Sequence, residues 1–234
     1  MNYDRYINQL KVDGFSVNDL KKLQSARVLV VGAGGLGCPV SLQLVAMGIG
    51  TITLIDDDLV EVHNLNRQTL FTPNQVGIAK VEAALSALKG FNPDCNIMTI
   101  EDRLSSRNAK SIIDSHDLVI DCTDNIPARY TIDKYCNTLG IPMIFGGVRM
   151  LEGQFGVFNY QKGISFTDVY PPSSNLEQLE DCESLGTFGF ACALIASHQV
   201  NEAYKILLEK PGVQDGKIVT IDLQRNTVLS IGKT

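Results

Sequence analysis

The sequence contains no C-x-x-C pair and no cluster of cysteine with histidine, so it shows no structural zinc site. Its six cysteines are scattered through apolar segments. Isolated thiols of this kind are typical of small core residues in a reducing compartment. We therefore expect a cytoplasmic protein whose cysteines are mostly core residues.

The sequence also lacks a basic block, a long apolar run and an apolar N-terminal core. Its net charge of −6, from 26 acidic and 20 basic residues, argues against nucleic acid or an anionic membrane as a partner. The longest apolar run, Phe188 to Ala196, is too short to cross a bilayer and predicts a core helix. Polar and charged residues within positions 1–14 leave no apolar core for a signal peptide, so we expect no secretion.

The stretch from Arg27 to Asp58 organises the chain. A short apolar run, Arg27 to Val31, precedes a glycine cluster, a helical apolar pattern and a second apolar run, Thr51 to Ile55. Strand, glycine turn, helix and strand in this order are typical of a nucleotide site, where free N–H groups and the helix dipole face a phosphate. The glycines permit the tight turn, the approach of a phosphate and the packing of the helix on its strand. They are Gly32, Gly34, Gly35 and Gly37.

Asp56 ends the second strand about twenty residues beyond the glycines, the position of an acid that accepts ribose hydroxyls. A polar segment, 57–71, follows and carries side chains that bind phosphate or metal: Asp58, Asn64, Arg67 and Gln68. Lys80 lies on the first turns of a helix expected from about Val76 to Lys89. Two cations near the phosphates favour a nucleotide, whereas the alternative is a pair of solvated surface charges.

A fourth strand, Asp117 to Asp121, ends in the segment Cys122-Thr123-Asp124-Asn125. The carboxyl ends of parallel strands bind ligands in open α/β folds, so Asp124 is a candidate magnesium ligand. The alternative is that Thr123, Asp124 or Asn125 merely caps the helix that runs to Leu139. The neighbouring elements are a third strand at 96–100, a helix at 106–115 and a fifth strand at 142–145 closed by Gly146-Gly147.

Beyond this point the pattern changes from alternating strands and helices to hairpins. We expect antiparallel strands at 154–160 and 163–166, a long loop at 167–189, an apolar helix at 190–210 and a hairpin of 217–223 with 227–231. The fold class is α/β: a Rossmann-like, mostly parallel sheet with helices on both faces, extended by C-terminal antiparallel strands. We divide the chain into a helical arm at 1–24, a nucleotide-binding part at 25–147 and an extension of the same domain at 148–234.

Seven motifs in order make the chain, from Arg5 to Lys205, resemble the ubiquitin-activating-enzyme-like adenylyltransferases, the group of the thiamine and molybdopterin sulfur-carrier activators. The motifs are VGAGGLG at 31–37, D-x-D at Asp56 and Asp58, NLNRQ at 64–68, G-x-x-K at 77–80, DCTDN-x-x-x-R at 121–129, GQF at 153–155 and NEAYK at 201–205. The resemblance implies that the protein adenylates a carboxylate with ATP and Mg²⁺ and releases pyrophosphate. This chemistry relies on positioning and charge neutralisation.

Carried over by position, the resemblance gives roles to the candidate residues. Asp56 would hold the ribose, and Asn64, Arg67 and Lys80 the triphosphate. Asp124 would hold magnesium with the help of Asp58. The remaining nucleotide contacts would come from Gly32, Gly34, Gly35, Gly37, Gln68, Asn125 and Arg129.

The chain also departs from the family pattern. Asn8 stands where family members usually carry an arginine that reaches the partner subunit's ATP site, with Arg5 or Lys11 as substitutes. Residues 164–168 replace a P-C-x-x-C motif, so the family's zinc is expected to be absent and hydrophobic packing to take its place. Cys182 aligns with a cysteine that some relatives use for sulfur or thioester transfer, and is either a nucleophile or an unreactive loop thiol. No sulfur-transfer segment follows, so we expect a separate downstream transfer enzyme.

The acceptor carboxylate remains open between two classes. One is the C-terminal glycine of a small sulfur-carrier protein, and the other is a small-molecule cofactor precursor such as guanylylpyridinol. An NAD-dependent dehydrogenase would explain the glycine turn and Asp56 but not Arg67, Lys80 and Asp124. An inactive scaffold is a further alternative, which the retention of these three residues opposes. The resemblance and the apolar arm predict a homodimer.

Overall fold

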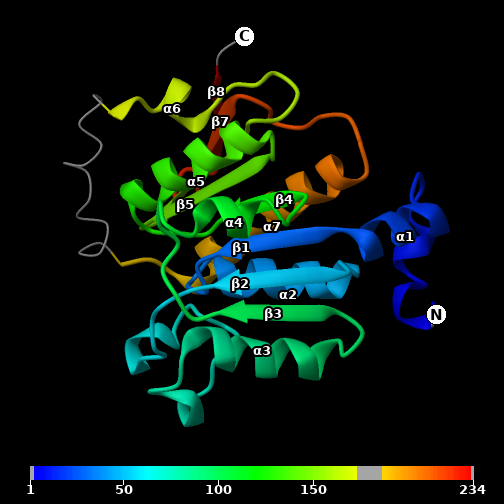
Figure 1. Ribbon diagram of the computed structural model, residues 1–234, viewed down its shortest axis with the longest axis vertical. Helices are drawn as coiled ribbons and strands as arrows, with labels where there is room; N and C mark the ends of the chain where they lie inside the picture. The colour runs from blue at the N-terminus through cyan, green and yellow to red at the C-terminus, as the bar shows by residue number, and fades with distance from the viewer. Residues whose placement is uncertain (1–2, 173–185, 233–234) are drawn as a thin grey trace.

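The computed structural model describes residues 3–172 and 186–232, and its centre is one eight-stranded sheet (Figure 1). The strand order is β3-β2-β1-β4-β5-β6-β7-β8, parallel from β3 to β5 and antiparallel from β5 to β8. The strands are β1 (Arg27–Val31), β2 (Thr51–Ile55), β3 (Asn96–Ile100), β4 (Leu118–Asp121), β5 (Met143–Arg149), β6 (Glu152–Phe158), β7 (Lys217–Asp222) and β8 (Thr227–Gly232). The expected fold class is confirmed.

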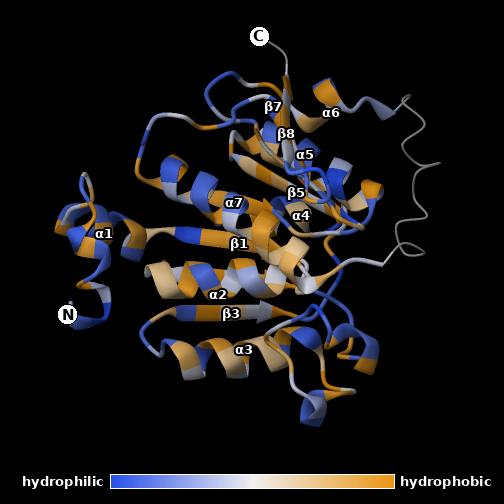
Figure 2. Ribbon diagram, turned by 180° about the vertical axis from the view of Figure 1, so that it is seen from behind, coloured by the Kyte–Doolittle hydropathy of each residue, from blue (hydrophilic) through white to orange (hydrophobic). Residues whose placement is uncertain are grey.

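Helices cover both faces of the sheet. They are α1 (Val17–Ser25), α2 (Gly37–Met47), α3 (Lys80–Phe91), α4 (Ala109–Ile113), α5 (Ile126–Leu139), α6 (Phe166–Val169) and α7 (Gly189–Leu207). The helices α2 and α7 lie on the side that faces the viewer in Figure 2, and α4 and α5 lie on the other. Within the described ranges, no helix combines the length and apolarity that a membrane crossing requires.

The central strands are apolar throughout because both of their faces are buried. In β1, Val28 and Val30 belong to the core under α2 and α7, while Leu29 and Val31 belong to the core under α4 and α5. Continuous apolar runs are the signature of parallel strands covered on both sides. The chain leaves β1 toward β2 and later returns on the other side as β4, so the strand order reverses between β1 and β4. Such a switch point opens a crevice at the carboxyl ends of the strands.

The helical arm expected at residues 1–24 is only partly α-helical over its described residues, 3–24. Two short 3-10 turns, Asp4–Tyr6 and Gln9–Lys11, precede α1, which begins after a capping box between Ser16 and Asp19. The reason is local: Gly14 has a positive φ of 78°, and the cap at Ser16 restarts the helix. The arm is nevertheless anchored, because Tyr6 is buried and its hydroxyl accepts a hydrogen bond from Asn92 Nδ2 at 3.2 Å.

Two helices are shorter than their sequence patterns predict. The helix expected from about 76 begins at Lys80, because residues 77–79 instead pair with the segment before them: Gly77 N–H donates to Val60 O, and Val60 N–H donates to Ile78 O, both at 2.8 Å. The helix expected at 106–115 covers only Ala109–Ile113. Lys80 therefore occupies the first helical position of α3.

The fifth strand and its neighbour also differ from expectation. β5 does not end before Gly146-Gly147 but continues to Arg149, because antiparallel pairing with β6 holds this extension. Residues 163–166 form no strand: Ser165 caps α6, and the buried carboxylate of Asp133 accepts the N–H groups of Phe166 and Thr167 at 2.8 and 3.1 Å. The carboxylate of Asp133 thus takes the place of a neighbouring strand as the acceptor for these two backbone N–H groups.

His116 gives the fold a pH dependence. Its Nδ1 donates to Ile112 O at 2.8 Å, so its Nε2, 2.7 Å from Thr53 Oγ1, accepts. Burial lowers the pKa of His116, Arg27 adds to the lowering, and the Ile112 hydrogen bond and Asp117 oppose it. As the pH falls below the unfolded pKa of about 6.5, the imidazole of the unfolded chain binds a proton that the folded chain excludes. The free energy of unfolding therefore decreases as the pH is lowered, by at most about 1.4 kcal/mol per pH unit.

The measurement is urea unfolding between about pH 7 and about pH 5. His116→Gln cannot titrate at this position, so its free energy of unfolding should fall less steeply than that of the wild type. The charges of Arg27 and Asp117 are common to both proteins and cancel in the comparison. Equal slopes would show that His116 does not carry this dependence.

Candidate nucleotide-binding cleft

A cleft of about 1210 Å³ opens at the carboxyl ends of the parallel strands, the left end of the sheet in Figure 1. It lies at the switch point between β1 and β4 and continues past β5 to β6 and α6. Most of the candidate residues line it although they come from distant parts of the sequence. They are Gly32, Gly34, Gly35, Asp56, Asp58, Asn64, Arg67, Gln68, Lys80, Asp124, Asn125 and Arg129.

The glycine turn is built by close backbone approaches. Gly32 has a φ of 95°, a conformation that side chains disfavour. Gly37 is absent from the cleft lining; a Cβ on it would overlap the carbonyl oxygen of Gly32. Gly37 therefore has the packing role that the sequence suggested, joining the start of α2 to the end of β1.

Asp56 is fastened to this turn. Its Oδ2 accepts the N–H of Ala33 at 2.6 Å, and its Oδ1 accepts the N–H of Asp58 at 2.9 Å. Burial raises the pKa of the Asp56 carboxyl, while the charge of Lys80 and these N–H groups lower it. The acid is thereby held in one orientation at the rim of the cleft, as a ribose ligand requires.

Lys80 and Asp58 form an ion pair inside the cleft. Lys80 Nζ lies 2.6 Å from Asp58 Oδ2, with the lysine side chain 8% and the aspartate side chain 60% exposed. The carboxylates of Asp56, Asp57 and Asp58 come within 4.8 Å of one another, a donor set that suits a hard divalent cation. Lys80 is therefore a buried cation that a short acidic segment holds in place.

The segment 64–68 places three candidate side chains. Asn64 Oδ1 accepts the N–H of Glu61 at 3.0 Å and so shapes the 3-10 turn Val62–Asn64. Arg67 Nη1 donates to His63 O and to Asn66 Oδ1, both at 3.0 Å. Gln68 is buried against Gly34, and its Oε1 has no hydrogen-bond partner among the residues that the structure covers. Gln68 is thus a cleft-lining residue with one buried, unpaired polar atom.

Asp124 and Asn125 have separate positions after β4. Asn125 is the helix cap, because its Oδ1 accepts the N–H of Ala128 at 3.0 Å. Asp124, which the sequence also allowed as the helix cap, is instead exposed and lines the cleft. Its carboxylate is therefore available to a ligand.

Arg129 lines the cleft but is bound mainly to the protein. Its Nη2 donates to Thr123 O at 2.9 Å, its Nε lies 3.5 Å from Asp121 Oδ2, and its guanidinium stacks on the Phe145 ring at 4.8 Å. Burial raises the pKa of Asp121, and the charge of Arg129 opposes this rise. The geometry makes Arg129 a support of the turn that carries Asp124.

Gln199 is a residue of this region that sequence reasoning missed. It is fully buried on α7, its Nε2 donates to Asp121 O at 2.8 Å, and a Cβ on Gly146 would overlap it. Its only signal in the sequence was a polar residue within an apolar helix. Gln199 thus holds the end of β4 from the α7 side of the sheet through the backbone of Asp121, and Arg129 contacts the carboxylate of the same residue.

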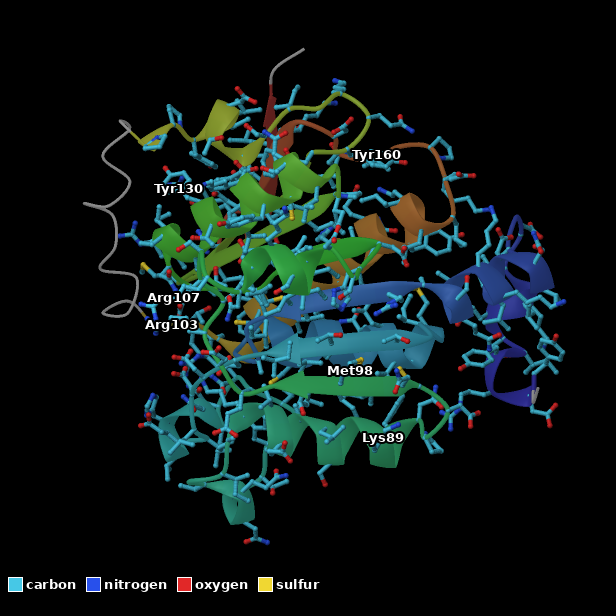
Figure 3. All side chains as sticks on the ribbon, in the orientation of Figure 1. Lys89, Met98, Arg103, Arg107, Tyr130 and Tyr160 are labelled. Carbon is cyan, nitrogen blue, oxygen red and sulfur yellow. The ribbon has the colours of Figure 1, made fainter. Side chains whose placement is uncertain are left out.

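Two further residues at the cleft were not predicted. Arg103 pairs with Asp57 at 3.3 Å and extends at the carboxyl end of the sheet (Figure 3). Cys192, read from the sequence as a core thiol, is buried but lines the cleft, with Sγ 3.0 Å from where a Cβ on Gly35 would lie. Burial raises the pKa of this thiol.

The remaining candidates lie elsewhere. Cys182 falls outside the described residues. Asn8, with Arg5 and Lys11, is exposed in the N-terminal arm, at the end of the sheet opposite the cleft (Figure 1). At 164–168, where the family's cysteine motif would lie, Phe166 packs against Phe145, Phe158 and Tyr170, with ring centroids 5.1 to 5.4 Å apart.

The sequence pattern of the ThiF family matches residues 6–233, which is nearly the whole chain. The chain belongs to the ThiF family. Within the family it is 38% identical over 218 residues to the adenylyltransferase and sulfurtransferase MOCS3 of Culex quinquefasciatus, covering 93% of this chain and 50% of that protein. It is 35% identical over 223 residues to a probable molybdopterin-synthase adenylyltransferase of Gracilaria tenuistipitata var. liui, covering 95% of this chain and 62% of that protein. This ThiF-family chain thus spans 50% and 62% of the length of these two relatives.

Solved structures share the fold of this ThiF-family chain. The crystal structure of E. coli MccB with ATP superimposes with a TM-score of 0.86 at 24% identity, over 99% of this chain and 72% of that one. Identity at this level supports the architecture alone. The architecture of the chain is thus one that a solved structure also has.

Proposed function

We propose that this ThiF-family chain activates a carboxylate as an acyl-adenylate with ATP and Mg²⁺, in cofactor biosynthesis. The observation that carries the proposal is the cleft: it gathers the glycine turn, Asp56, Lys80 and Asp124 from separate segments around one cavity. The sequence relatives named adenylyltransferases support the same chemistry.

In this reaction a carboxylate oxygen attacks the α-phosphorus of ATP. A bond forms between that oxygen and phosphorus, and the bond from phosphorus to the bridging oxygen breaks, so that pyrophosphate leaves with the electron pair. The protein needs no covalent group for this step. Its contribution is to align the two reactants and to stabilise the negative charge that grows on the phosphate oxygens.

The described side chains can divide this work. Asp56 would accept hydrogen bonds from the ribose, and the N–H groups of the glycine turn would donate to phosphate. Lys80 and Arg67 would neutralise the triphosphate. Gln68, with its unsatisfied buried oxygen, would complete the pocket through a donor on the nucleotide.

Magnesium fits the oxygen donors of this cleft. Asp124 is exposed within it, and Asp58 keeps one carboxylate oxygen beyond its contact with Lys80. These two carboxylates would hold the ion, as the family resemblance suggested, with Asp56 and Asp57 adjoining. Bound there, magnesium would shield the charge of the phosphates.

The acceptor belongs to one of the two classes that the sequence left open: the C-terminal glycine of a ubiquitin-like sulfur carrier, or a small cofactor precursor. A separate transfer enzyme would then consume the adenylate. The test is ATP–pyrophosphate exchange with Mg²⁺, run once with a carrier protein ending in Gly-Gly and once with a pool of small carboxylates. Exchange in either reaction supports adenylation. Exchange in neither would overturn it and favour an inactive scaffold or an NAD-binding protein.

Arg67→Ala should lower the exchange rate by about a hundredfold, because one cation near the leaving pyrophosphate is lost. The fold should persist, since the side-chain hydrogen bonds of Arg67 within residues 3–172 and 186–232 go to His63 O and Asn66 Oδ1 in its own loop. Arg225→Ala, which removes an exposed arginine on the distant β7–β8 hairpin, is the matched control. A near-normal rate for Arg67→Ala would remove this residue from the mechanism.

We also propose a homodimer. Apolar side chains stay exposed on the N-terminal arm, with Ile7 53%, Val12 57% and Val17 43% accessible. The edge strand β8 is exposed along its whole length. Sedimentation velocity at micromolar concentration should give twice the 25.5 kDa mass of the chain. A species of single mass would contradict the proposal.

A further inference from the structure

One face of α7 lies against the cleft from behind. A Cβ on Gly189 would meet the backbone of the 64–68 segment at 3.1 Å, and Cys192 Sγ lies 3.0 Å from where a Cβ on Gly35 would be. Gln199 is seven residues beyond Cys192, so it projects from the same side of the helix, and it reaches the end of β4. The same helix thus contacts the 64–68 segment, the glycine turn and the turn after β4.

Gln199 makes the polar contact of this face. Its side chain is fully buried, and its Nε2 donates to Asp121 O at 2.8 Å. Asp121 is the last residue of β4 and is paired with Val31 of β1 and with Phe145 of β5. The amide of Gln199 therefore holds the backbone at the point where the chain leaves the sheet.

Asp121 in turn sets the course of the residues that follow. Its Oδ1 accepts the N–H of Thr123 at 2.9 Å and the hydroxyl of Thr123 at 2.6 Å, which fixes a turn directly after the strand. Asp124 comes next, with an exposed carboxylate that lines the cleft. Hydrogen bonds thus lead from Gln199 to Asp121, and from Asp121 to the residue before Asp124.

The position of the Gln199 amide depends on a glycine of β5. A Cβ on Gly146 would overlap Cδ, Nε2 and Oε1 of Gln199, and these are the atoms nearest to it. A side chain at position 146 would therefore force the amide away from Asp121 O. Gly146 leaves the space that this contact needs.

We propose that Gln199 is a positioning residue for Asp124 as a magnesium ligand. This inference rests on the proposed adenylation and adds to its site a residue that does not itself line the cleft. Because the Asp124 carboxylate is exposed, its place in the cleft depends on the backbone that carries it. Loss of a partner that orients a metal ligand without touching the metal typically weakens metal affinity by about tenfold to a hundredfold.

The alternative is a structural role alone, in which Gln199 only satisfies a buried carbonyl group. Loss of the amide would then lower the stability of the fold and leave the affinity for magnesium unchanged. Magnesium affinity and stability must therefore be measured separately.

The first test replaces Gln199 by methionine, which keeps the length of the side chain and removes its N–H donor. Thermal stabilisation by a fixed concentration of ATP is measured at increasing Mg²⁺, a readout that does not require turnover. The Mg²⁺ concentration that gives half of the stabilisation should rise by about tenfold to a hundredfold in Gln199→Met. With a chelator in place of Mg²⁺, the effect of ATP should be the same in variant and wild type. An unchanged magnesium requirement would overturn the proposal.

Glu202 provides the matched control on the same helix. It is as deeply buried as Gln199, but its carboxylate accepts hydrogen bonds from Lys205 Nζ at 2.7 Å and from the N–H of Gln214 at 2.9 Å, away from the cleft. Glu202→Gln should lower the melting temperature and leave the magnesium requirement unchanged. If it raised that requirement as much as Gln199→Met does, lost stability would be the cause and the proposal would fall.

The second test moves the amide without changing Gln199. Gly146→Ala should displace the amide and raise the magnesium requirement about as much as Gln199→Met does. In a Gln199→Ala background the added methyl group has room, so Gly146→Ala should have no further effect there. An equal effect in both backgrounds would assign the change to β5 and overturn the proposal. Gly146→Ala alone decides the matter if the Gln199 variants do not fold, because an unchanged magnesium requirement would again overturn it.

These measurements can fail separately from the proposed function. Absence of ATP–pyrophosphate exchange in the wild type with every acceptor would overturn adenylation, whereas the magnesium titrations would still support or overturn the role of Gln199. Normal exchange in the wild type, together with an unchanged magnesium requirement in Gln199→Met and Gly146→Ala, would overturn only the positioning role.

Discussion

Replacing Asp124 by alanine is expected to lower ATP–pyrophosphate exchange by about a thousandfold, the scale of losing a charge-stabilising group in an active site. Asp124 follows β4, lines the cleft and has its carboxylate exposed to a ligand. If it holds magnesium, its loss removes the ion that shields the phosphates. Apparent affinity for Mg²⁺, read from exchange at increasing magnesium, should weaken together with the rate.

The fold should survive this change, because the helix cap belongs to Asn125 and the carboxylate of Asp124 is exposed. Asp114→Ala, which removes an exposed carboxylate at the end of α4, provides the control for a change of surface charge. Both variants should unfold at nearly the same urea concentration as the wild type. Near-normal exchange in Asp124→Ala would exclude the residue from the mechanism.

Gly37→Ala should abolish the stable fold or weaken it by about 3 kcal/mol or more. The added Cβ would overlap the carbonyl oxygen of Gly32, which is backbone and cannot rotate away. Either α2 or the glycine turn would have to move, and the turn is tied to Asp56 through Ala33. The measurement is the free energy of unfolding in urea, with Mg·ATP binding as a second readout.

A glycine in another helix supplies the matched control. Gly90 lies near the end of α3, and a Cβ there would meet nothing within 4 Å. Gly90→Ala should raise the free energy of unfolding by about 0.5 to 1 kcal/mol, the helix preference of alanine over glycine. If Gly37→Ala were as stable as Gly90→Ala, close packing at Gly37 would not be the reason for a glycine there.

The parallel half of the fold could be predicted because its signals are local and agree with one another. The strands at 27–31, 51–55 and 96–100 have the bounds that their apolar runs suggest. The antiparallel extension of the sheet was harder to predict. A glycine pair usually ends a strand, yet β5 passes through Gly146 and Gly147 because β6 and Gln199 pack against it, and both are distant in the sequence.

The candidate site could be predicted from motifs, but its supports could not. Asp56, Arg67, Lys80 and Asp124 belong to recognisable patterns, and the structure brings them to one cleft. Gln199 and Cys192 belong to an apolar helix and carry no such pattern. Their position depends on how α7 lies against β4, β5 and the glycine turn, which only tertiary packing decides.

The turn after β4 assigns stability and chemistry to adjacent residues. Asn125 holds the helix in place, while the exposed carboxylate of Asp124 beside it has one contact, a long hydrogen bond of 3.5 Å from Asn125 Nδ2 to Oδ1, among the residues that the structure describes. Under the proposed function, one nucleotide change at the codon for Asp124 would therefore silence catalysis without disturbing the protein that surrounds it. A catalyst of the proposed kind would then lie a single substitution away from a folded scaffold that has lost the reaction, and the reverse substitution would be equally short.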